Sequence, residues 1–509
     1  MWRSKIQAGL SMLLVAGMVL SGCSGSSGGG SKESAPAASG GAGASSGGSE
    51  LKPYEITIAF WGPDQKDLGL VEEEISKLTK DKINATVKLR RIESAAWTQQ
   101  KVLMFSGNEQ VDLVFTGEDQ YISEVAQKKL VPLDDLLQAY GQDIIAAFDP
   151  DVLAASKIEG VTYGVPSIRD FAAYPTMLMR TDLVEQYGID TGAIHSLKDM
   201  GPVFETVKSK QPELSLIGKA AGGGSIAYPL LQTTIDPLGD MVGVLTDTND
   251  LQVVNLYESP EYADFVTTLR EFYEAGYIPK DIATTSQTGR DYIKANIGFS
   301  TPNKGKPGIT TQTGNWTGKD LVEVQLAPAK MNTLTITNAM LAIAKNSKDP
   351  ERAMMFLNLL YSDKEIINLL HWGIEGKHYK VNDNGTIGFP DGVDASSSGY
   401  NLRQGWMFGN QLLAYPWETD SPDIWTQMDK FNREAEKSQA LGFMYNPEPV
   451  KTELAAIQNV VQQYAMALET GTIDPTEHLP KFNASLKSAG IDKVIAEKQK
   501  QLDAWAAGR

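Results

Sequence analysis

Tyr54-Glu-Ile-Thr-Ile-Ala-Phe-Trp-Gly-Pro63 is the stretch that decides the fold class. Its apolar side chains alternate along the chain, which predicts a β-strand, and the Gly-Pro pair ends that strand. The same strand and helix patterns then alternate: helices over 68–80 and 95–105, strands over 85–92 and 111–116. This β-α-β-α-β order predicts an α/β fold with mainly parallel sheets and helices on both faces.

Polar and aromatic residues follow the carboxyl ends of two of these strands, where ligands collect in parallel sheets. The predicted ligand-binding residues there are Trp61, Asp64, Gln65, Glu118 and Asp119. Trp61 as a core aromatic is the alternative. We favour a ligand contact because the Gly-Pro pair takes the chain out of the sheet directly after it.

The N-terminus carries an export pattern. A cationic start precedes an apolar run over 8–20, which has the length of a signal-peptide core and is too short to span a bilayer. Leu20-Ser-Gly-Cys23 resembles a bacterial lipobox, in which the cysteine thiol receives diacylglycerol. We therefore expect a signal peptide over 1–22 and a lipidated N-terminus at Cys23, the only cysteine. An ordinary secretory signal is the alternative.

Residues 23–53 are predicted to form a disordered linker, because Ser, Gly and Ala dominate and cannot bury enough apolar surface to fold. A Gly/Ser chain of this length reaches about 30 Å. Lipid and linker together would hold the folded body at the outer face of the bacterial cell membrane.

Charge and composition exclude several classes of function. The formal net charge is −17, and removing Arg3 and Lys5 with the signal leaves −19. Such a chain lacks the basic surface that binding nucleic acid or anionic lipid requires. Four histidines are too few and too scattered for a histidine-rich metal site. We expect no metal and no cofactor.

A family resemblance rests on two adjacent segments. Gly160-Val-Thr-Tyr-Gly-Val-Pro166 forms a turn, and a strand then runs into Arg180-Thr-Asp-Leu183. With the three strands before them, they resemble the extracellular solute-binding proteins of ABC importers, nearest the sugar-binding branch. The resemblance implies a periplasmic-binding-protein-like type II fold, with two lobes joined by a hinge. It also places Arg169 and Asp170 at the cleft floor as ligand-binding residues; a surface ion pair is the alternative.

The resemblance further implies a domain division. Residues 54–166 and 325–370 would form lobe 1, and 167–324 lobe 2. His371-Trp-Gly-Ile-Glu-Gly-Lys-His-Tyr379 is similar to the signature of LplA-type lipoproteins, whose chains end in an extra domain. We therefore expect residues 371–509 to form a helical C-terminal domain that packs mainly on lobe 2.

Several aromatic residues are further candidates for the cleft. Tyr228 follows a glycine-rich loop, and Trp316 lies in a segment that we interpret as a loop because it lacks an amphipathic pattern. Four tryptophans fall in one short segment: Trp372, Trp406, Trp417 and Trp425. Flat aromatic faces suit sugar rings but also fill cores. We expect one or two of these four to contact ligand and select Trp372 and Trp406.

The sequence thus predicts a lipid-anchored, monomeric receptor that captures a carbohydrate, an oligosaccharide, between its lobes for import by ABC permease subunits. No catalysis is required. Arg169 and Arg403 leave room for an acidic sugar, and Arg169→Ala is expected to weaken binding of such a sugar more than of a neutral one. Two alternatives stay open. A lipid-anchored glycoside hydrolase would need two carboxylates, such as Glu118 and Asp170, and a ligand sensor or adhesin would act without a transporter.

Overall fold

The computed structural model describes residues 51–107, 109–247 and 250–509, except the side chains of Glu118 and Asp119. The predicted signal peptide over 1–22, the predicted lipidation site at Cys23 and nearly all of the predicted linker over 23–53 lie outside the described residues. Within the described ranges, no helix has both the length and the apolar character needed to cross a bilayer.

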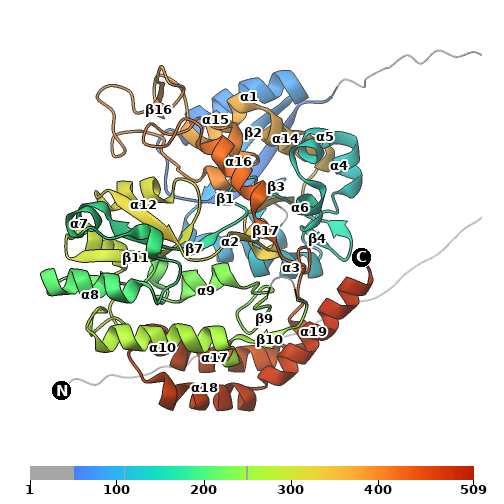
Figure 1. Cartoon of the computed structure of the whole chain (residues 1–509). Helices are drawn as coiled ribbons and strands as arrows, with labels where there is room; N and C mark the ends of the chain where they lie inside the picture. The colour runs from blue at the N-terminus through green and yellow to red at the C-terminus, as the bar shows by residue number, and fades with distance from the viewer. Residues whose placement is uncertain (1–50, 108, 248–249) are drawn as a thin grey trace, which may run out of the picture. The chain divides into compact units, whose positions relative to one another are not determined.

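The first sheet has five strands in the order β2-β1-β3-β14-β6 (Figure 1). β1 (Tyr54–Trp61) runs parallel to β2 (Ala85–Ile92) and to β3 (Leu113–Thr116), as the alternating pattern predicts. β14 (Met340–Ile343) runs antiparallel to β3 and to β6 (Gly164–Pro166). β14 joins this sheet late in the chain, after an excursion through a second sheet.

Helices cover the first sheet and complete what we call lobe 1. α1 (Leu68–Ile83), α14 (Pro350–Ser362) and α15 (Lys364–Trp372) pack against one another. Val71, Ile75, Thr79 and Ile83 recur on one face of α1 at helical spacing, so that face is buried. The other helices of lobe 1 are α2 (Trp97–Ser106), α3 (Glu118–Ala126), α4 (Asp134–Tyr140), α5 (Gln142–Ala147) and α6 (Pro150–Ala154).

The second sheet, the centre of lobe 2, has the order β12-β7-β11-β8. β7 (Tyr174–Arg180) is antiparallel to both β11 (Gly298–Gly305) and β12 (Leu321–Gln325), and only β8 (Ser215–Ile217) runs parallel to β11. The sheets are therefore mixed rather than mainly parallel. β7 leads away from lobe 1 and β12 leads back, so these neighbours must run in opposite directions. The helices of lobe 2 are α7 (Thr181–Tyr187), α8 (Met200–Lys210), α9 (Tyr228–Thr234), α10 (Pro260–Glu274), α11 (Gly289–Lys294) and α12 (Ile309–Thr317).

Three segments cross between the lobes side by side. The first crossing pairs with the second through Ala173 and Lys330, whose backbone groups exchange hydrogen bonds of 3.1 and 2.9 Å. The second crossing contains β13 (Lys330–Met331), which pairs in parallel with β17 (Glu436–Lys437) of the third. A third crossing was not among the sequence predictions, and the predicted lobe boundaries themselves stay predictions.

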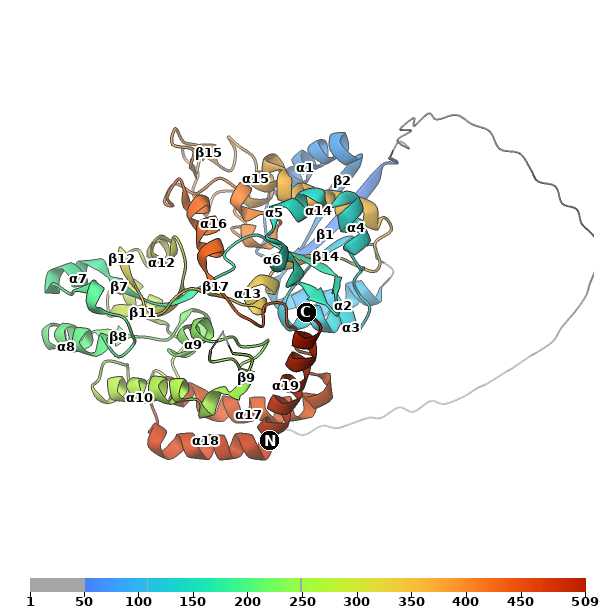
Figure 2. The ribbon, with the colours of Figure 1, turned by 45° about the vertical axis from the view of Figure 1, so that its right-hand side comes forward.

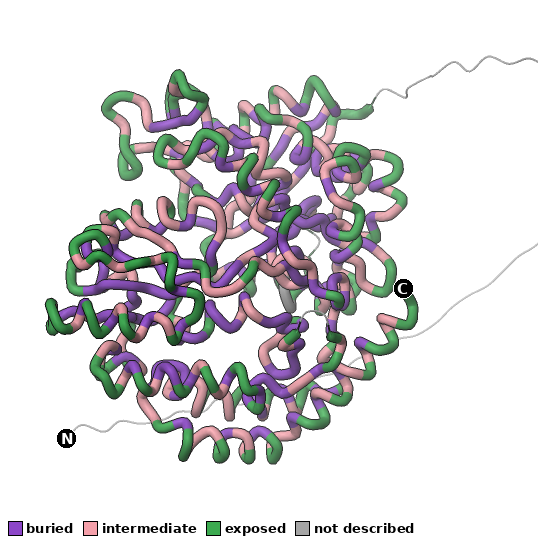
Figure 3. The backbone as a smooth tube through the Cα atoms, viewed as in Figure 1, coloured by how far each residue is buried: buried purple, intermediate pink, exposed green. Residues whose placement is uncertain are grey.

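The segment after residue 371 divides between two separate cores. Tyr400, Met407 and Phe408 are buried in the core of lobe 1, whereas Ile457 and Phe482 are buried in the core of lobe 2. Figure 3 shows buried stretches of backbone in both lobes. α17 (Lys451–Leu468) and α18 (Pro475–Ala489) lie beneath α10, and α19 (Ile491–Ala507) rises from them beside β9 (Gly243–Val244) and β10 (Val254–Asn255) (Figures 1 and 2). Residues 371–509 therefore do not all pack on lobe 2, because Tyr400, Met407 and Phe408 belong to the core of lobe 1. The predicted bounds of the C-terminal domain stay a prediction.

Candidate ligand-binding site

A cavity of about 750 Å³ opens where the two lobes, the first hinge crossing and the segment after residue 371 meet. This volume lies within the range of small-molecule sites in proteins. Each of these four parts of the chain supplies walls: lobe 1 through Trp61, Trp97, Phe115 and Gln120, the hinge through Arg169 and Asp170, lobe 2 through Lys306, Gln312 and Asn315, and the later segment through His371, Trp372, Arg403, Trp406, Trp417, Asp420 and Trp425.

An aromatic cluster forms the lobe 1 side of this cavity. Trp61 ends β1 and Phe115 lies in the adjacent β3, so the parallel strands bring both rings to one edge of the sheet. Their centroids lie 6.3 Å apart, and the ring of Trp406 lies 5.7 Å from Trp61 and 5.8 Å from Phe115. All three contacts are edge-to-face, the geometry that aromatic quadrupoles favour, so these rings are held in fixed orientations.

A second aromatic group lines the cavity at the end of α15. Trp372 ends α15, its ring lies 5.4 Å from that of Trp417, and its Nε1 donates a hydrogen bond of 3.1 Å to the carbonyl of Tyr415. The Arg403 guanidinium lies 5.1 Å from the Trp417 ring. Arg403 has a backbone φ of 50°, a conformation uncommon for a residue other than glycine. Such conformations are concentrated at functional sites.

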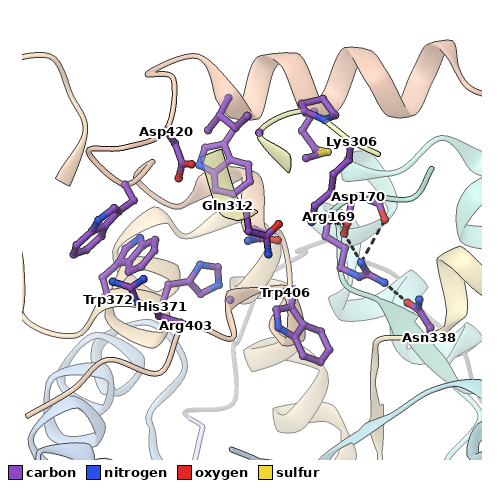
Figure 4. A pocket seen from close by; sticks show the side chains of 18 of the residues that line it. Arg169, Asp170, Lys306, Gln312, Asn338, His371, Trp372, Arg403, Trp406 and Asp420 are labelled. Carbon is purple, nitrogen blue, oxygen red and sulfur yellow. Dashed lines mark hydrogen bonds and ion pairs between the residues drawn. The ribbon is translucent and has the colours of Figure 1, made fainter. Parts of the chain in front are cut away.

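A charged cluster occupies the hinge side (Figure 4). The Asp170 carboxylate accepts hydrogen bonds from the Arg169 guanidinium and, at 2.8 Å, from the Lys306 ammonium. Arg169 also donates to the Oδ1 of Asn338 in lobe 1. Burial alone would raise the pKa of Asp170, but the Lys306 and Arg169 cations outweigh burial and hold that pKa well below its usual range. Asp170 is therefore an ionised bridge between the lobes.

Three polar atoms of the wall are buried without a hydrogen-bond partner among the described residues: Arg169 Nε, His371 Nε2 and Trp425 Nε1. Buried polar groups in proteins nearly always have partners, so such atoms on a cavity wall mark places for ligand or water. Burial lowers the pKa of His371 to about 4, so the ring is neutral at physiological pH. Burial also raises the pKa of Asp420, against the opposing effect of Lys306 and Arg403.

Six of the predicted site residues line this cavity: Trp61, Arg169, Asp170, Trp372, Arg403 and Trp406. Asp64 and Gln65 do not, because each has a partner elsewhere. The Asp64 carboxylate forms a 2.6 Å ion pair with Arg91, and the Gln65 Oε1 accepts a 2.6 Å hydrogen bond from the backbone of Asn401. Glu118 and Asp119 begin α3 beside the cavity-lining Gly117, but their side chains lie outside the described part of the chain.

Tyr228 and Trp316 also lie away from the cavity. Tyr228 begins α9 and lines a different pocket. Trp316 belongs to helix α12 rather than to a loop, and its exposed ring has the Arg290 guanidinium and the Lys294 ammonium each at 4.8 Å. These cations give the ring a stable position without a core or a ligand.

The sequence interpretation missed several wall residues. Lys306, Gln312 and Asn338 come from separate parts of the chain and carry no local motif. His371 belongs to the signature-like segment over 371–379, whose pattern does not by itself indicate a cavity wall. Trp417 and Trp425 were considered only as members of the tryptophan-rich segment, yet all four tryptophans of that segment line the cavity. Clusters of three or more His, Cys, Asp or Glu side chains that could hold a metal ion do not occur among the described residues.

The family model for bacterial extracellular solute-binding proteins matches residues 62–366. The chain belongs to that family. Residues 439–507 match a second model, described only as a domain of unknown function (DUF3502). The fold is thus the two-lobed periplasmic-binding-protein-like architecture that the sequence predicts, with a helical C-terminal region.

Individual relatives are similar to this chain over nearly its whole length. A carbohydrate ABC transporter substrate-binding protein of Streptococcus pneumoniae serotype 4 (strain ATCC BAA-334 / TIGR4) is 30% identical, over 89% of this chain and 90% of the relative. The crystal structure of the N-glycan transport solute-binding protein NgtS of S. pneumoniae has 28% identity and a TM-score of 0.79, covering 90% of this chain and 99% of that one. NgtS in complex with Man5GlcNAc has 27% identity and a TM-score of 0.67, covering 90% and 99%.

Proposed function

We propose that this protein captures an oligosaccharide in the inter-lobe cavity and delivers it to ABC permease subunits. The observation that carries the proposal is the wall composition: six of the nine tryptophans of the chain line one cavity, together with buried polar atoms that lack partners. Aromatic faces cover the apolar C–H faces of sugar rings, and polar atoms bind hydroxyl groups. The family membership and the NgtS complexes support this assignment.

The sugar class follows from the relatives and from the wall. NgtS is described in complex with Man5GlcNAc, so mannose- and N-acetylglucosamine-containing oligosaccharides are the first candidates. An acidic residue in the sugar would meet Arg403 rather than Arg169. The Arg169 guanidinium is already bound to Asp170 and Asn338. Among the described residues, the exposed Arg403 donates a hydrogen bond to the neutral Asn401 at 2.9 Å and interacts with the Asp420 carboxyl through its charge alone.

The direct test is calorimetric titration of the protein with three oligosaccharide sets: mannose–N-acetylglucosamine, neutral glucose-based and uronic-acid-containing. We expect saturable binding of at least one set, with the sugar recovered unchanged. Absence of binding to any oligosaccharide would contradict the proposal. Arg403→Ala should weaken only the acidic set, and an equal loss for neutral sugars would remove the role assigned to Arg403.

The same incubation separates the receptor from a glycoside hydrolase. The hydrolase alternative places Asp170 among its two carboxylates. The depressed pKa of Asp170 excludes the general-acid role, and the hydrogen bonds from Arg169 and Lys306 occupy the carboxylate that a nucleophile or general base would need free. We therefore propose that the protein is not an enzyme. Chromatographic detection of shortened sugars at a rate proportional to protein would overturn this.

We further propose that Cys23 carries the lipid and that the protein acts as a monomer at the outer face of the cell membrane. The lipobox resemblance and the linker composition support the anchor. Metabolic labelling with a fatty-acid analogue tests it: Cys23→Ala should abolish the label and release the protein into the medium. Retention of the label in that variant would exclude Cys23.

A further inference from the structure

We propose that a second pocket, between lobe 2 and helix α17, binds a small organic cation with an apolar body, whose ammonium group pairs with the Glu469 carboxylate. The pocket has a volume of about 400 Å³. It is separate from the sugar cavity and shares no wall residue with it. One of its walls belongs to the region of residues 439–507, for which the family comparison gives no function.

The pocket combines apolar walls with tyrosine rings. Its apolar residues come from α9, from the segment between α9 and β9 (Gly243–Val244), from 3-10 helix η4 (Leu256–Glu258) and from α17: Leu231, Met241, Leu256, Val461, Ala465 and Met466. Tyr228 and Tyr257 add aromatic surface. Apolar walls favour a ligand with a hydrocarbon body, and tyrosine rings attract a cation within about 6 Å of their faces.

Glu469 is the only acidic residue that lines this pocket, and it is 9% exposed. Its carboxylate accepts hydrogen bonds from the Ser225 hydroxyl and, at 3.2 Å, from the Tyr262 hydroxyl. Both partners are neutral. Among the described residues, no cation forms an ion pair with Glu469. Arg270 donates hydrogen bonds to the carbonyls of Gly471 and Thr472, close to Glu469 in the sequence, but forms its ion pair with Glu274.

A buried carboxylate without a cationic partner is energetically unfavourable, and a cationic ligand would supply that partner. Consistent with this, burial raises the pKa of Glu469 to about 7, and the two neutral hydrogen bonds only partly oppose the increase. At the exposed rim of the pocket, the Lys304 ammonium lies 6.0 Å from the centroid of the Tyr228 ring. Tyr257 and Tyr262 are the titratable groups that interact with the Glu469 charge. Burial first, and then the Glu469 charge, raise the pKa of both. They are uncharged at pH 7 and cannot replace the missing cation.

The experiment titrates the full chain by calorimetry at pH 8 with benzylammonium and with benzyl alcohol, which has nearly the same shape without the charge. We expect saturable binding of benzylammonium, and binding of the alcohol at least about tenfold weaker, since a tenfold difference corresponds to about 1.4 kcal/mol. Equal binding of both compounds, or no binding of the amine, would overturn the proposal.

Two variants locate the site. Glu469→Gln keeps the shape and removes the charge, and it should weaken benzylammonium binding at least tenfold, whereas the exposed Glu448→Gln should leave it unchanged. Tyr228→Ala alters the exposed rim without touching the carboxylate, so it supplies a second test if Glu469→Gln fails to fold. Unchanged amine affinity in the folded variants would disprove the assignment.

A proton measurement separates ion pairing from simple burial of a neutral ligand. Pairing an ammonium with a half-protonated carboxyl group at pH 7 releases about half a proton, which appears as a difference in binding enthalpy between buffers of different ionisation enthalpy. Glu469→Gln should abolish that difference. Oligosaccharide affinity should be the same in this variant as in the wild type, so failure of this proposal would leave the proposed sugar function intact.

Discussion

The Lys306 ammonium lies 2.8 Å from the Asp170 carboxylate and thereby ties the end of β11 in lobe 2 to the first hinge crossing. Both side chains are less than one-third exposed, so water screens the pair less than a surface pair. Arg169 extends the contact to Asn338 in lobe 1. The position of lobe 2 relative to lobe 1 is therefore linked to one ionised carboxylate.

The first prediction concerns Asp170→Asn. The variant leaves the Arg169 and Lys306 cations without their anion, and breaking a buried pair in this way costs about 3–5 kcal/mol, with the lower end expected for a partly exposed group. Urea unfolding at pH 7 measures the loss. Asp391→Asn, at an exposed ion pair with Lys380, is the control and should have little effect.

The pH dependence gives that prediction a sign. The folded-state pKa of Asp170 lies below its unfolded value of about 4, so its contribution is present above pH 4 and is lost as pH falls through the folded pKa. The difference between wild type and Asp170→Asn should therefore shrink below pH 4. A difference that stays constant down to pH 2 would contradict the ionised bridge.

The second prediction concerns the aromatic wall. Trp406→Ala removes a ring that contacts Trp61 and Phe115, and truncating a central tryptophan typically costs at least about 2 kcal/mol of binding energy, roughly 30-fold in affinity. Calorimetry with the best oligosaccharide measures this. Trp316→Ala is the matched control, because the Trp316 ring lies outside the cavity. The oligosaccharide affinity of this variant should equal that of the wild type. Equal losses in both variants would argue against stacking at Trp406.

The third prediction concerns His371. Its pKa is about 4 in the folded protein and about 6.5 in the unfolded chain, so the unfolded state binds more protons between these values. Stability should therefore rise with pH from 4 to 6.5, by at most about 1.4 kcal/mol per unit from this group. His371→Gln should flatten the profile in that window, whereas the exposed His195→Gln is its control. An unchanged slope in His371→Gln would show that the buried ring does not titrate as inferred.

The fourth prediction concerns lobe closure. Solute-binding proteins of two lobes close around ligand by hinge motion. Adding the oligosaccharide should lower the radius of gyration in X-ray scattering. It should also change tryptophan fluorescence, because most tryptophans line the cavity. At the same sugar concentration, the radius of gyration of Trp406→Ala should decrease less than that of the wild type. A radius that does not change at saturating sugar would mean that the lobes do not close.

The sequence predicted the parts of the site that depend on local pattern. Trp61 was located because a strand that alternates and ends at Gly-Pro places its last residue at the sheet edge. Trp372 and Trp406 were located because tryptophans are concentrated in one segment. Lys306 and Asn338 could not be found in this way, because only the tertiary arrangement of the hinge brings them to Arg169 and Asp170.

Trp316 and Tyr228 lie outside the cavity, and their sequence patterns explain why each was expected in it. No apolar stripe predicts burial of Trp316, and Tyr228 directly follows a glycine-rich loop. Four of the nine residues of α12 are Thr, so its sequence gives no apolar stripe, and cations from α11 hold Trp316 at the surface. Tyr228 lines the pocket of Glu469. Absence of a core pattern therefore identifies an exposed aromatic residue but not the surface to which it belongs.

The parallel pairing of β13 with β17 limits how the lobes can move. With only two crossings, one lobe could twist about the axis of the hinge segments as well as rotate toward the other lobe. The third crossing is held to the second by backbone hydrogen bonds from Glu436 to Ala329 and from Ser438 to Met331. The three paired segments form a small sheet, which bends more easily than it twists. The lobes are therefore expected to close by rotation about a single axis. Each closure then brings the wall from residues 371–435 and the wall from lobe 2 to the same relative position around the sugar.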